Sequence, residues 1–200
     1  KQIREQTAFI RGYDKAIKVR IANYPEAETL MQISGVGSQV ALAFICTIED
    51  PHRFPNVRSI ASYLGLRPRI DDSGEIHKEL HITKAGDGDM RRLLVNSAQY
   101  ILGPMGPDSD LRRWGIKLIE RGGSAPRKKA VIAVARKLAV VLLSLWKSGA
   151  AYDPLRRAKL LDVARSPQIG ERFVDLGTGE GEDHQGRLGR ELERAVEQLE

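Results

Sequence analysis

The segment from residue 128 to residue 146, KKAVIAVARKLAVVLLSLW, is the most apolar helical pattern in the chain. Its apolar residues recur every three or four positions, which is the period of an α-helix. The longest apolar run, around residues 139–145, is far shorter than the ~20 residues of a membrane span. With 200 residues, 42% hydrophobic and 29% charged, the chain is typical of a soluble globular protein that buries one sizeable core.

Helical patterns separated by glycine and proline account for most of the remaining chain up to residue 150. Residues 66–86 are the exception, because they have no helical period and favour a short hairpin or an extended loop. Asn56 is predicted to cap the helix that follows it, and Ser124 the apolar helix. The segments predicted as helices are Lys1–Ala22, Glu26–Ile33, Ser38–Ile48, Val57–Leu64, 87–102, 111–120 and 128–146. The fold class is therefore mainly α.

Three regions are predicted. Residues 1–24 form a helical connector, the end of a coiled coil, because apolar residues such as Ile3, Ile10 and Ile17 make a seam among charges. Residues 25–157 form a helical domain containing a helix-hairpin-helix. Residues 158–200 are a polar, glycine-rich tail that is expected to be partly disordered.

Basic residues concentrate in the body of the chain. Residues 1–150 hold 24 Lys and Arg against 15 Asp and Glu, whereas residues 151–200 hold 8 against 11. Such clustering favours a polyanion, which releases counterions on binding; a solvated helix face explains it equally well. The candidate DNA-binding cations are Arg127, Lys128, Lys129, Arg136 and Lys137.

The segment LMQISGVGSQVALAFI, residues 30–45, has the form of a helix-hairpin-helix. Glycine permits the tight turn, and free N–H groups at the start of the second helix attract an anion. Gly35, Val36, Gly37 and Ser38 are therefore predicted to bind a DNA phosphate without reading its sequence. The alternative is an ordinary helical hairpin that happens to use glycine.

Ser73 lies in the motif DDSG, whose residues are common in turns. Its surroundings also suit a nucleophile, because phosphoryl transfer requires cations around the phosphate oxygens. The candidates for positioning that phosphate are Arg67, Arg69, Lys84, Arg91 and Arg92.

The other chemistry-bearing residues are interpreted as structural. Cys46 stands in an apolar run and is expected to be a buried thiol. His77 and His81 lack a third ligand for zinc, and the loop aspartates are more simply caps than magnesium ligands. No metal site or cofactor is predicted in this chain.

Several motifs, in this order, resemble the C-terminal domain of the IS110 (IS116/IS110/IS902-type) family of insertion-sequence transposases. The resemblance runs from about residue 30 to about residue 157. The motifs are LMQISGVGSQVA, RFPNVRSIASYLGLRPRIDDSGE, ITKAGDGDMRRLLVNSAQYIL, DSDLRRWGIKLIERGG and KKAVIAVARKLAVVLLSLW.

The resemblance implies a DNA recombinase that moves an insertion sequence by strand exchange, guided by an RNA encoded in the element. The family joins an N-terminal RuvC-like domain, whose four acidic residues bind Mg²⁺, to a C-terminal domain with a serine nucleophile. Ser73, with Gly74, matches that serine. The implied partners are duplex DNA, the guide RNA and further copies of the chain, without a membrane, in the cytoplasm at the nucleoid.

Three departures from the family pattern stand out. Ser34 replaces a usual proline in the hairpin, and Asp87 replaces a frequent asparagine. The chain is also expected to begin inside the helical connector, without the acidic domain. Two other functions stay open: a non-catalytic helix-hairpin-helix module that only binds nucleic acid, and an oligomerisation scaffold built on the first helix and the apolar one.

Overall fold

The computed structural model describes residues 2–73, 76–123 and 125–156, and the side chains of all of these except residues 70–73 and 76–80. The chain divides into a first compact unit, residues 1–155, and the remaining residues 156–200. The first unit is mainly helical and includes one two-stranded antiparallel hairpin. The mainly α fold class is therefore confirmed. The region predicted as a polar tail lies outside the described residues.

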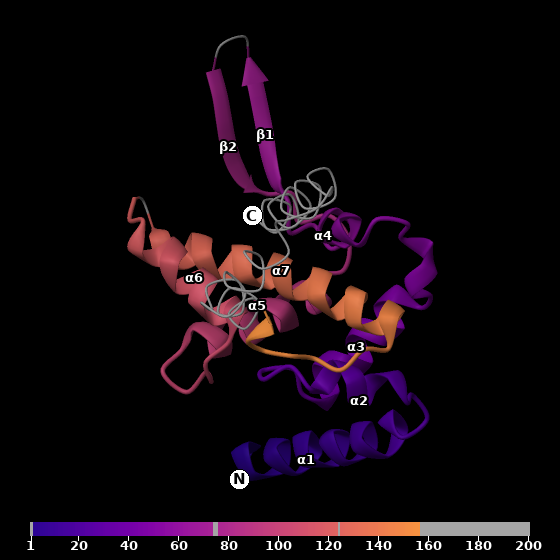
Figure 1. Cartoon of the computed structure of the whole chain (residues 1–200). Coiled ribbons are helices and arrows are strands. Elements are labelled where there is room, and N and C mark those ends of the chain that lie inside the picture. Colours follow the sequence, from indigo (N-terminus) through magenta and orange to yellow (C-terminus); the bar gives the residue numbers. More distant parts are fainter. Residues whose placement is uncertain (1, 74–75, 124, 157–200) are drawn as a thin grey trace, which may run out of the picture. The chain divides into compact units, whose positions relative to one another are not determined.

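Helix α7 (Pro126–Ser148) is the centre of this unit. It contacts α2 (Glu26–Met31), α4 (Ile60–Tyr63), α5 (Gly88–Leu102) and α6 (Asp110–Glu120), which are gathered round it in Figure 1. Its buried residues are Ala130, Val131, Val134, Ala135, Leu138, Ala139, Leu142, Leu143 and Leu145. Each large apolar side chain of this kind stabilises the fold by about 1.5–3 kcal/mol when it leaves water.

Polar side chains cap the starts of some of the other helical segments, including the second 3-10 turn after α3 and helix α5. Helix α3 (Ser38–Ile48) is followed by two 3-10 turns, Pro51–Arg53 and Val57–Ser59. Asn56 caps the second turn through a 2.9 Å bond from the Arg58 N–H, as predicted. The Asp87 carboxylate accepts from the N–H groups of Asp89 and Met90 and starts α5.

Two predictions about this region are wrong. Cys46 is exposed on α3, because the apolar run that contains it turns only one face to the core. Helix α7 has Ala125 at its N-cap, in the left-handed conformation and without a side-chain cap. Ser124, the predicted cap, lies outside the described residues. The chain reverses through Gly122 and Gly123, both with positive φ, just before this start.

Helix α1 (Gln2–Ile21) contacts α3 and contains no buried residue. Ile21, at its end, packs against the core cluster, whereas Ile3 is 80% exposed and Tyr13 70% exposed. The helix is therefore attached at its C-terminal part, and most of its apolar seam is uncovered.

The hairpin consists of β1 (Pro68–Ser73) and β2 (Ile76–Ile82). The strands contact each other, and Figure 1 shows them projecting from the helices near α4. Pairing runs from Pro68 opposite Ile82 to Ser73 opposite Ile76, with an irregularity between Pro68 and Ile70. A short hairpin was one of the two structures predicted for this segment; the projection of the hairpin from the helical body was not predicted.

Candidate functional site

The turn between α2 and α3 is built on Gly35. The Val36 N–H donates to the Ile33 carbonyl at 2.9 Å, and Gly35 has a φ of +94° at the third turn position. A type II turn requires such a residue there and favours proline at the second position, which Ser34 occupies. A side chain at Gly35 would also lie 3.0 Å from a ring carbon of Tyr100 in α5. The sequence and the packing therefore both require glycine at position 35.

The start of α3 is open. Gly37 is its N-cap residue, in extended conformation, and no side chain caps the helix. A Cβ added at Gly37 would meet nothing within 4 Å. The first N–H groups of a helix have no intrahelical acceptor, so those of α3 remain available to an anion that approaches past Gly37.

Ser73 is the last residue of β1, at the end of the hairpin away from the helices. Six strand residues at about 3.3 Å each span roughly 20 Å. Arg67 precedes the strand, and Lys84 and Arg91 follow the hairpin. The candidate nucleophile and these candidate cations, which are neighbours in sequence, are therefore at opposite ends of the hairpin.

The base of the hairpin is a close crossing of two chain segments. Gly65 and Gly86 have positive φ, and a Cβ at either would lie within 2.2 Å of a backbone oxygen of the other segment. The N–H groups of Thr83 and Lys84 donate to the carbonyls of Arg67 and Gly65 at 3.0 and 3.1 Å. Lys84 itself has a φ of +57°, a conformation that costs about 1 kcal/mol or more outside glycine.

Arg91 fastens this crossing to α5. Its Nη1 donates to the carbonyls of Leu64, Ala85 and Asp87 at 3.0, 2.7 and 3.2 Å. Arg92, the next residue, is 71% exposed and pairs with Asp89 at 3.0 Å. Arg67, Arg69 and Lys84 are exposed. Of the five phosphate-positioning candidates, Arg91 is thus the one whose charge bridges backbone segments.

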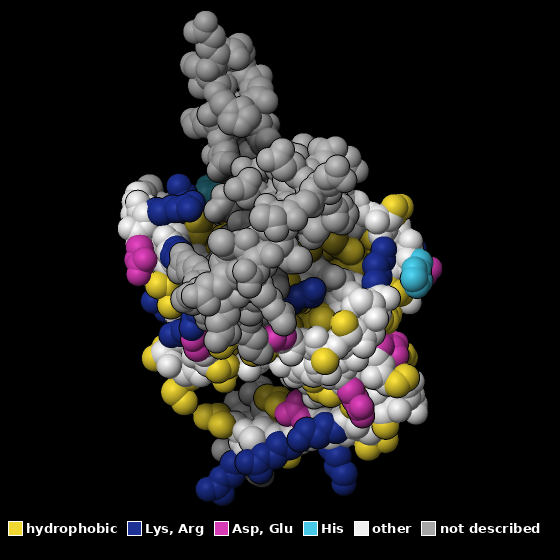
Figure 2. Space-filling model, viewed as in Figure 1, with side chains coloured by type: hydrophobic (Ala, Val, Ile, Leu, Met, Phe, Trp, Pro, Cys, Tyr) yellow, Lys and Arg dark blue, Asp and Glu magenta, His cyan; other side chains and the backbone are white. Residues whose placement is uncertain are grey.

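Five exposed cations gather where α6 ends and α7 begins, because a tight turn joins the two helices. Within the described residues none of their side chains has a hydrogen bond or an ion pair. Figure 2 shows Lys and Arg side chains at this end of the molecule. We call this cluster the basic end; it consists of Lys117, Arg121, Arg127, Lys128 and Lys129.

The other cations of the basic stretch are bound to the protein itself. The ammonium nitrogen of Lys137 lies 4.5 Å from the centre of the Trp114 ring. The Arg136 side chain is half-buried and also interacts with the protein. Arg112 donates to the Ile101 carbonyl at 2.5 Å, and Arg113 pairs with Asp108. The structure therefore separates Arg127, Lys128 and Lys129 from Arg136 and Lys137, which the sequence placed in one group.

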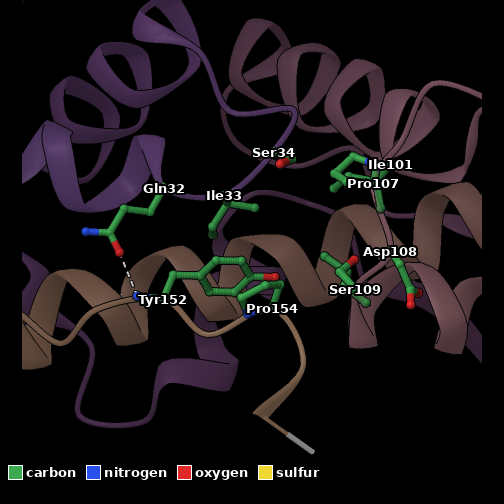
Figure 3. Close-up of a pocket in the computed structure, with 10 residues that line it drawn as sticks. Gln32, Ile33, Ser34, Ile101, Pro107, Asp108, Ser109, Tyr152 and Pro154 are labelled. Carbon is green, nitrogen blue, oxygen red and sulfur yellow. Dashed lines mark hydrogen bonds between the residues drawn. The ribbon is translucent and has the colours of Figure 1, made fainter. Parts of the chain in front are cut away.

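A small pocket of about 90 Å³ lies between the turn after α2, the α5–α6 loop and the segment after α7 (Figure 3). The Tyr152 N–H donates to the Gln32 side-chain oxygen at 2.6 Å. Burial raises the pKa of the Tyr152 phenol, and the Asp110 and Asp153 carboxylates raise it further. The Arg113 side chain, by its hydrogen bond, lowers the pKa of exposed Asp108 at the pocket rim. The pocket is a packing junction that holds the chain after α7.

A comparison with known proteins finds one family profile that matches the segment containing both the Gly35 turn and the hairpin. Residues 27–110 match the profile of the Transposase IS116/IS110/IS902 family. Residues 27–110 carry a domain of this transposase family. The matched range begins in α2 and ends at the first residue of α6, so it includes Gly35, Gly37 and Ser73 and excludes the whole basic end.

Relatives of the transposase domain match a longer part of the chain than the profile does. The chain is 30% identical over 144 residues to the transposase for insertion sequence element IS1111A of Coxiella burnetii, covering 72% of this chain and 39% of the relative. It is 28% identical over 148 residues to a probable family 20 transposase of Pseudomonas aeruginosa, covering 74% and 43%. A pilin gene-inverting protein of Moraxella lacunata is 29% identical over 132 residues, covering 66% and 39%.

The chain therefore spans about two fifths of the length of these relatives. Two of them are named for transposition and one for gene inversion, and both names describe DNA rearrangement. Within the described residues no helix is long and apolar enough to cross a membrane.

Proposed function

We propose that this transposase domain binds DNA through a helix-hairpin-helix formed by α2, the Gly35 turn and α3. The observation that carries the proposal is the uncapped start of α3 behind Gly37, where a Cβ would meet nothing. A phosphate there would accept hydrogen bonds from backbone N–H groups and would be favoured by the helix dipole.

The basic end supplies the second contact. Arg127, Lys128 and Lys129 occupy the first turn of α7, where no acidic residue is present. Cations at a helix N-terminus oppose the helix dipole and destabilise the helix slightly. Bound phosphates would reverse this effect, because each would meet the dipole and the side-chain charges together.

A salt series of duplex DNA affinity tests both contacts. Replacing Arg127, Lys128 and Lys129 with Gln should reduce the slope of log K against log salt by about 2 to 3 if each binds one phosphate. The control replaces Arg4, Arg11 and Lys15 of α1 with Gln, which removes the same charge from an exposed helix. Equal slopes for the two variants would contradict a role for the basic end.

The turn is tested by Gly37→Asp. Its extended conformation suits an N-cap aspartate, which bonds the N–H groups that a phosphate would need. The free energy of unfolding should therefore stay equal or rise by a few tenths of a kcal/mol, while DNA affinity falls. A variant that folds well and binds DNA as tightly as the original chain would refute the helix-hairpin-helix contact.

We further propose that Ser73 is the nucleophile of strand cleavage. Its hydroxyl oxygen would attack a DNA phosphodiester, form a phosphoserine bond and release a strand that ends in a hydroxyl group, which takes up the proton. Reversal on another strand completes the exchange. Support comes from the family match and from the place of Ser73 at the end of a projecting strand.

Other groups must stabilise the phosphate during this step, because Lys84 and Arg91 lie at the base of the hairpin. We assign this role to groups outside the described residues, with Mg²⁺ held by the acidic domain of the family. In the described part of the chain, no three His, Cys, Asp or Glu side chains are grouped as metal ligands.

Adduct formation with labelled DNA, detected after denaturation, tests the nucleophile. With the acidic domain of the family and Mg²⁺ supplied, the original chain should form an adduct that Ser73→Ala loses while both keep their DNA affinity. An adduct that persists in Ser73→Ala would refute the assignment. The alternative function, a non-catalytic helix-hairpin-helix module, predicts binding without an adduct in either protein.

Two partners complete the proposal. Guide RNA would use the same phosphate contacts, so the basic-end variant should weaken binding of structured RNA as well. The exposed seam of α1 would pair with a second copy, and the substitution of Glu for Ile3 and Ile10 should lower the mass seen in sedimentation. Retention of the mass would count against that pairing.

A further inference from the structure

A groove of about 520 Å³ runs between the helix-hairpin-helix turn and α5. One wall is the end of α2, the turn and the start of α3, and the other is α5. The α5 wall consists of Leu93, Asn96, Ser97 and Tyr100. The groove thus opens beside the helix start at which the proposed phosphate site lies.

Ser97 is the unusual residue of this groove. It is 3% exposed, yet its hydroxyl has no hydrogen bond to any described residue. The Ser97 hydroxyl is not fully enclosed by the protein. Because Ser97 lines the groove, the accessible part of its hydroxyl faces the groove. Buried hydroxyl groups normally find a partner in protein or in a ligand. Ser97 therefore marks the groove as a place for a polar ligand.

The remaining walls suit a nucleoside. Tyr100 is 46% exposed, and its ring rests against Gly35. The exposed Asn96 and Gln39 provide amide donors and acceptors, and Val36 and Ile33 provide an apolar floor. The described residues of the lining include no charged side chain, so backbone N–H donors would hold the anionic group of a ligand and the groove would hold its uncharged part. The volume lies within the range of small-ligand sites.

We propose that this groove binds one unpaired nucleotide, with its phosphate at the start of α3 and its nucleoside against Tyr100, Asn96 and Ser97. A base stacked inside a duplex cannot enter a groove walled on both sides, whereas a base turned out of the stack can. This inference rests on the proposed phosphate contact and adds the class of ligand: single-stranded or unpaired DNA or RNA.

The test compares a single-stranded thymidine 12-mer, a single-stranded uridine 12-mer and a 12-base-pair duplex at one salt concentration. Tyr100→Ala should lower affinity for at least one single strand about 5-fold or more, the usual effect of a lost base–aromatic contact. Duplex affinity should change less than 2-fold. The strand that loses affinity identifies DNA or RNA as the source of the nucleotide.

The Ser97→Ala variant separates a loss of ligand affinity from a loss of folding. Removing an unpartnered hydroxyl should leave thermal stability unchanged or higher, while single-strand affinity falls about 2- to 10-fold. Tyr100→Phe should keep most of the affinity, because it keeps the ring. Gln99→Ala is the matched control, since Gln99 is an exposed polar residue of α5 outside the groove.

Failure of this inference is distinct from failure of the phosphate contact. If Gly37→Asp weakens binding to all three probes and neither groove variant discriminates single strands from duplex, the phosphate contact stands and the nucleotide groove is refuted. If Gly37→Asp changes none of the affinities, the phosphate contact is refuted and the groove proposal with it.

Discussion

Arg91→Ala should loosen the hairpin from the helical body. One guanidinium nitrogen, Nη1, joins three carbonyls that belong to the end of α4, the end of the hairpin and the start of α5. The contacts to Ala85 and Asp87 are exposed, and the contact to Leu64 is partly buried. Water can replace Arg91 at the exposed carbonyls, whereas the Leu64 carbonyl loses its partner.

The magnitude follows from that difference. A hydrogen bond from a charged donor contributes about 1.5–3 kcal/mol, so the loss of one partly buried contact should reduce the free energy of unfolding by about 2 kcal/mol. Arg92→Ala is the matched control, because it removes the same charge from the next position. Its exposed pair with Asp89 is worth about 0–1 kcal/mol.

Urea unfolding followed by circular dichroism measures both variants. With a slope of about 2 kcal/mol per molar urea, Arg91→Ala should lower the midpoint by about 1 M and Arg92→Ala by less than half as much. Hydrogen exchange at the amides of Thr83 and Lys84, which close the hairpin base, should accelerate only in Arg91→Ala. Equal midpoints and equal exchange in the two variants would refute the anchoring role.

Two further predictions concern backbone crowding and pH. Gly86→Ala should destabilise the domain by about 2–5 kcal/mol, since its Cβ would lie 2.2 Å from the Tyr63 oxygen at a φ of +73°; Gly122→Ala, with a φ of +74° and open space, should cost about 1 kcal/mol in the same thermal melts. Burial raises the pKa of Tyr152 above its ordinary value near 10, so the unfolded chain loses the phenol proton first and stability should fall as pH rises above about 10. Tyr152→Phe should flatten that fall in denaturant titrations between pH 8 and pH 11, and an unchanged pH profile would contradict the raised pKa.

The helices could be predicted because their signals are local. The period of apolar residues, the cap residue Asn56 and the glycine and proline breakers act within a turn or two of the chain, so the predicted ranges lie close to α1–α7. The lack of a helical period in residues 66–86 likewise predicted the hairpin. Its projection depends on packing between distant segments, for which the sequence alone carries no local signal.

The grouping of the candidate site residues depended on sequence distance, which is a poor guide across a hairpin. Ser73 and Arg91 are 18 positions apart and were expected to act together, but an extended strand moves Ser73 away from the helices. A usable signal was present in Gly65 and Gly86, the glycines that flank the hairpin and permit its tight crossing. Similarly, the sequence grouped Lys137 with the cations of the basic end, whereas in the structure its side chain lies over the ring of Trp114. This contact joins α7 to α6, and the sequence carries no local signal for it.

Attachment of the hairpin only at its base has a consequence for how the family could change its reach. Inserting two residues in each strand would carry Ser73 about 7 Å further from the helices with the same face of the ribbon preserved. Inserting one in each strand would carry it half as far and turn every side chain beyond the insertion to the opposite face. Neither change would alter a residue of the helical core. Under the proposed role of Ser73, the length of the hairpin could thus be adjusted to a DNA target in steps of two residues per strand, without a change in the helical core.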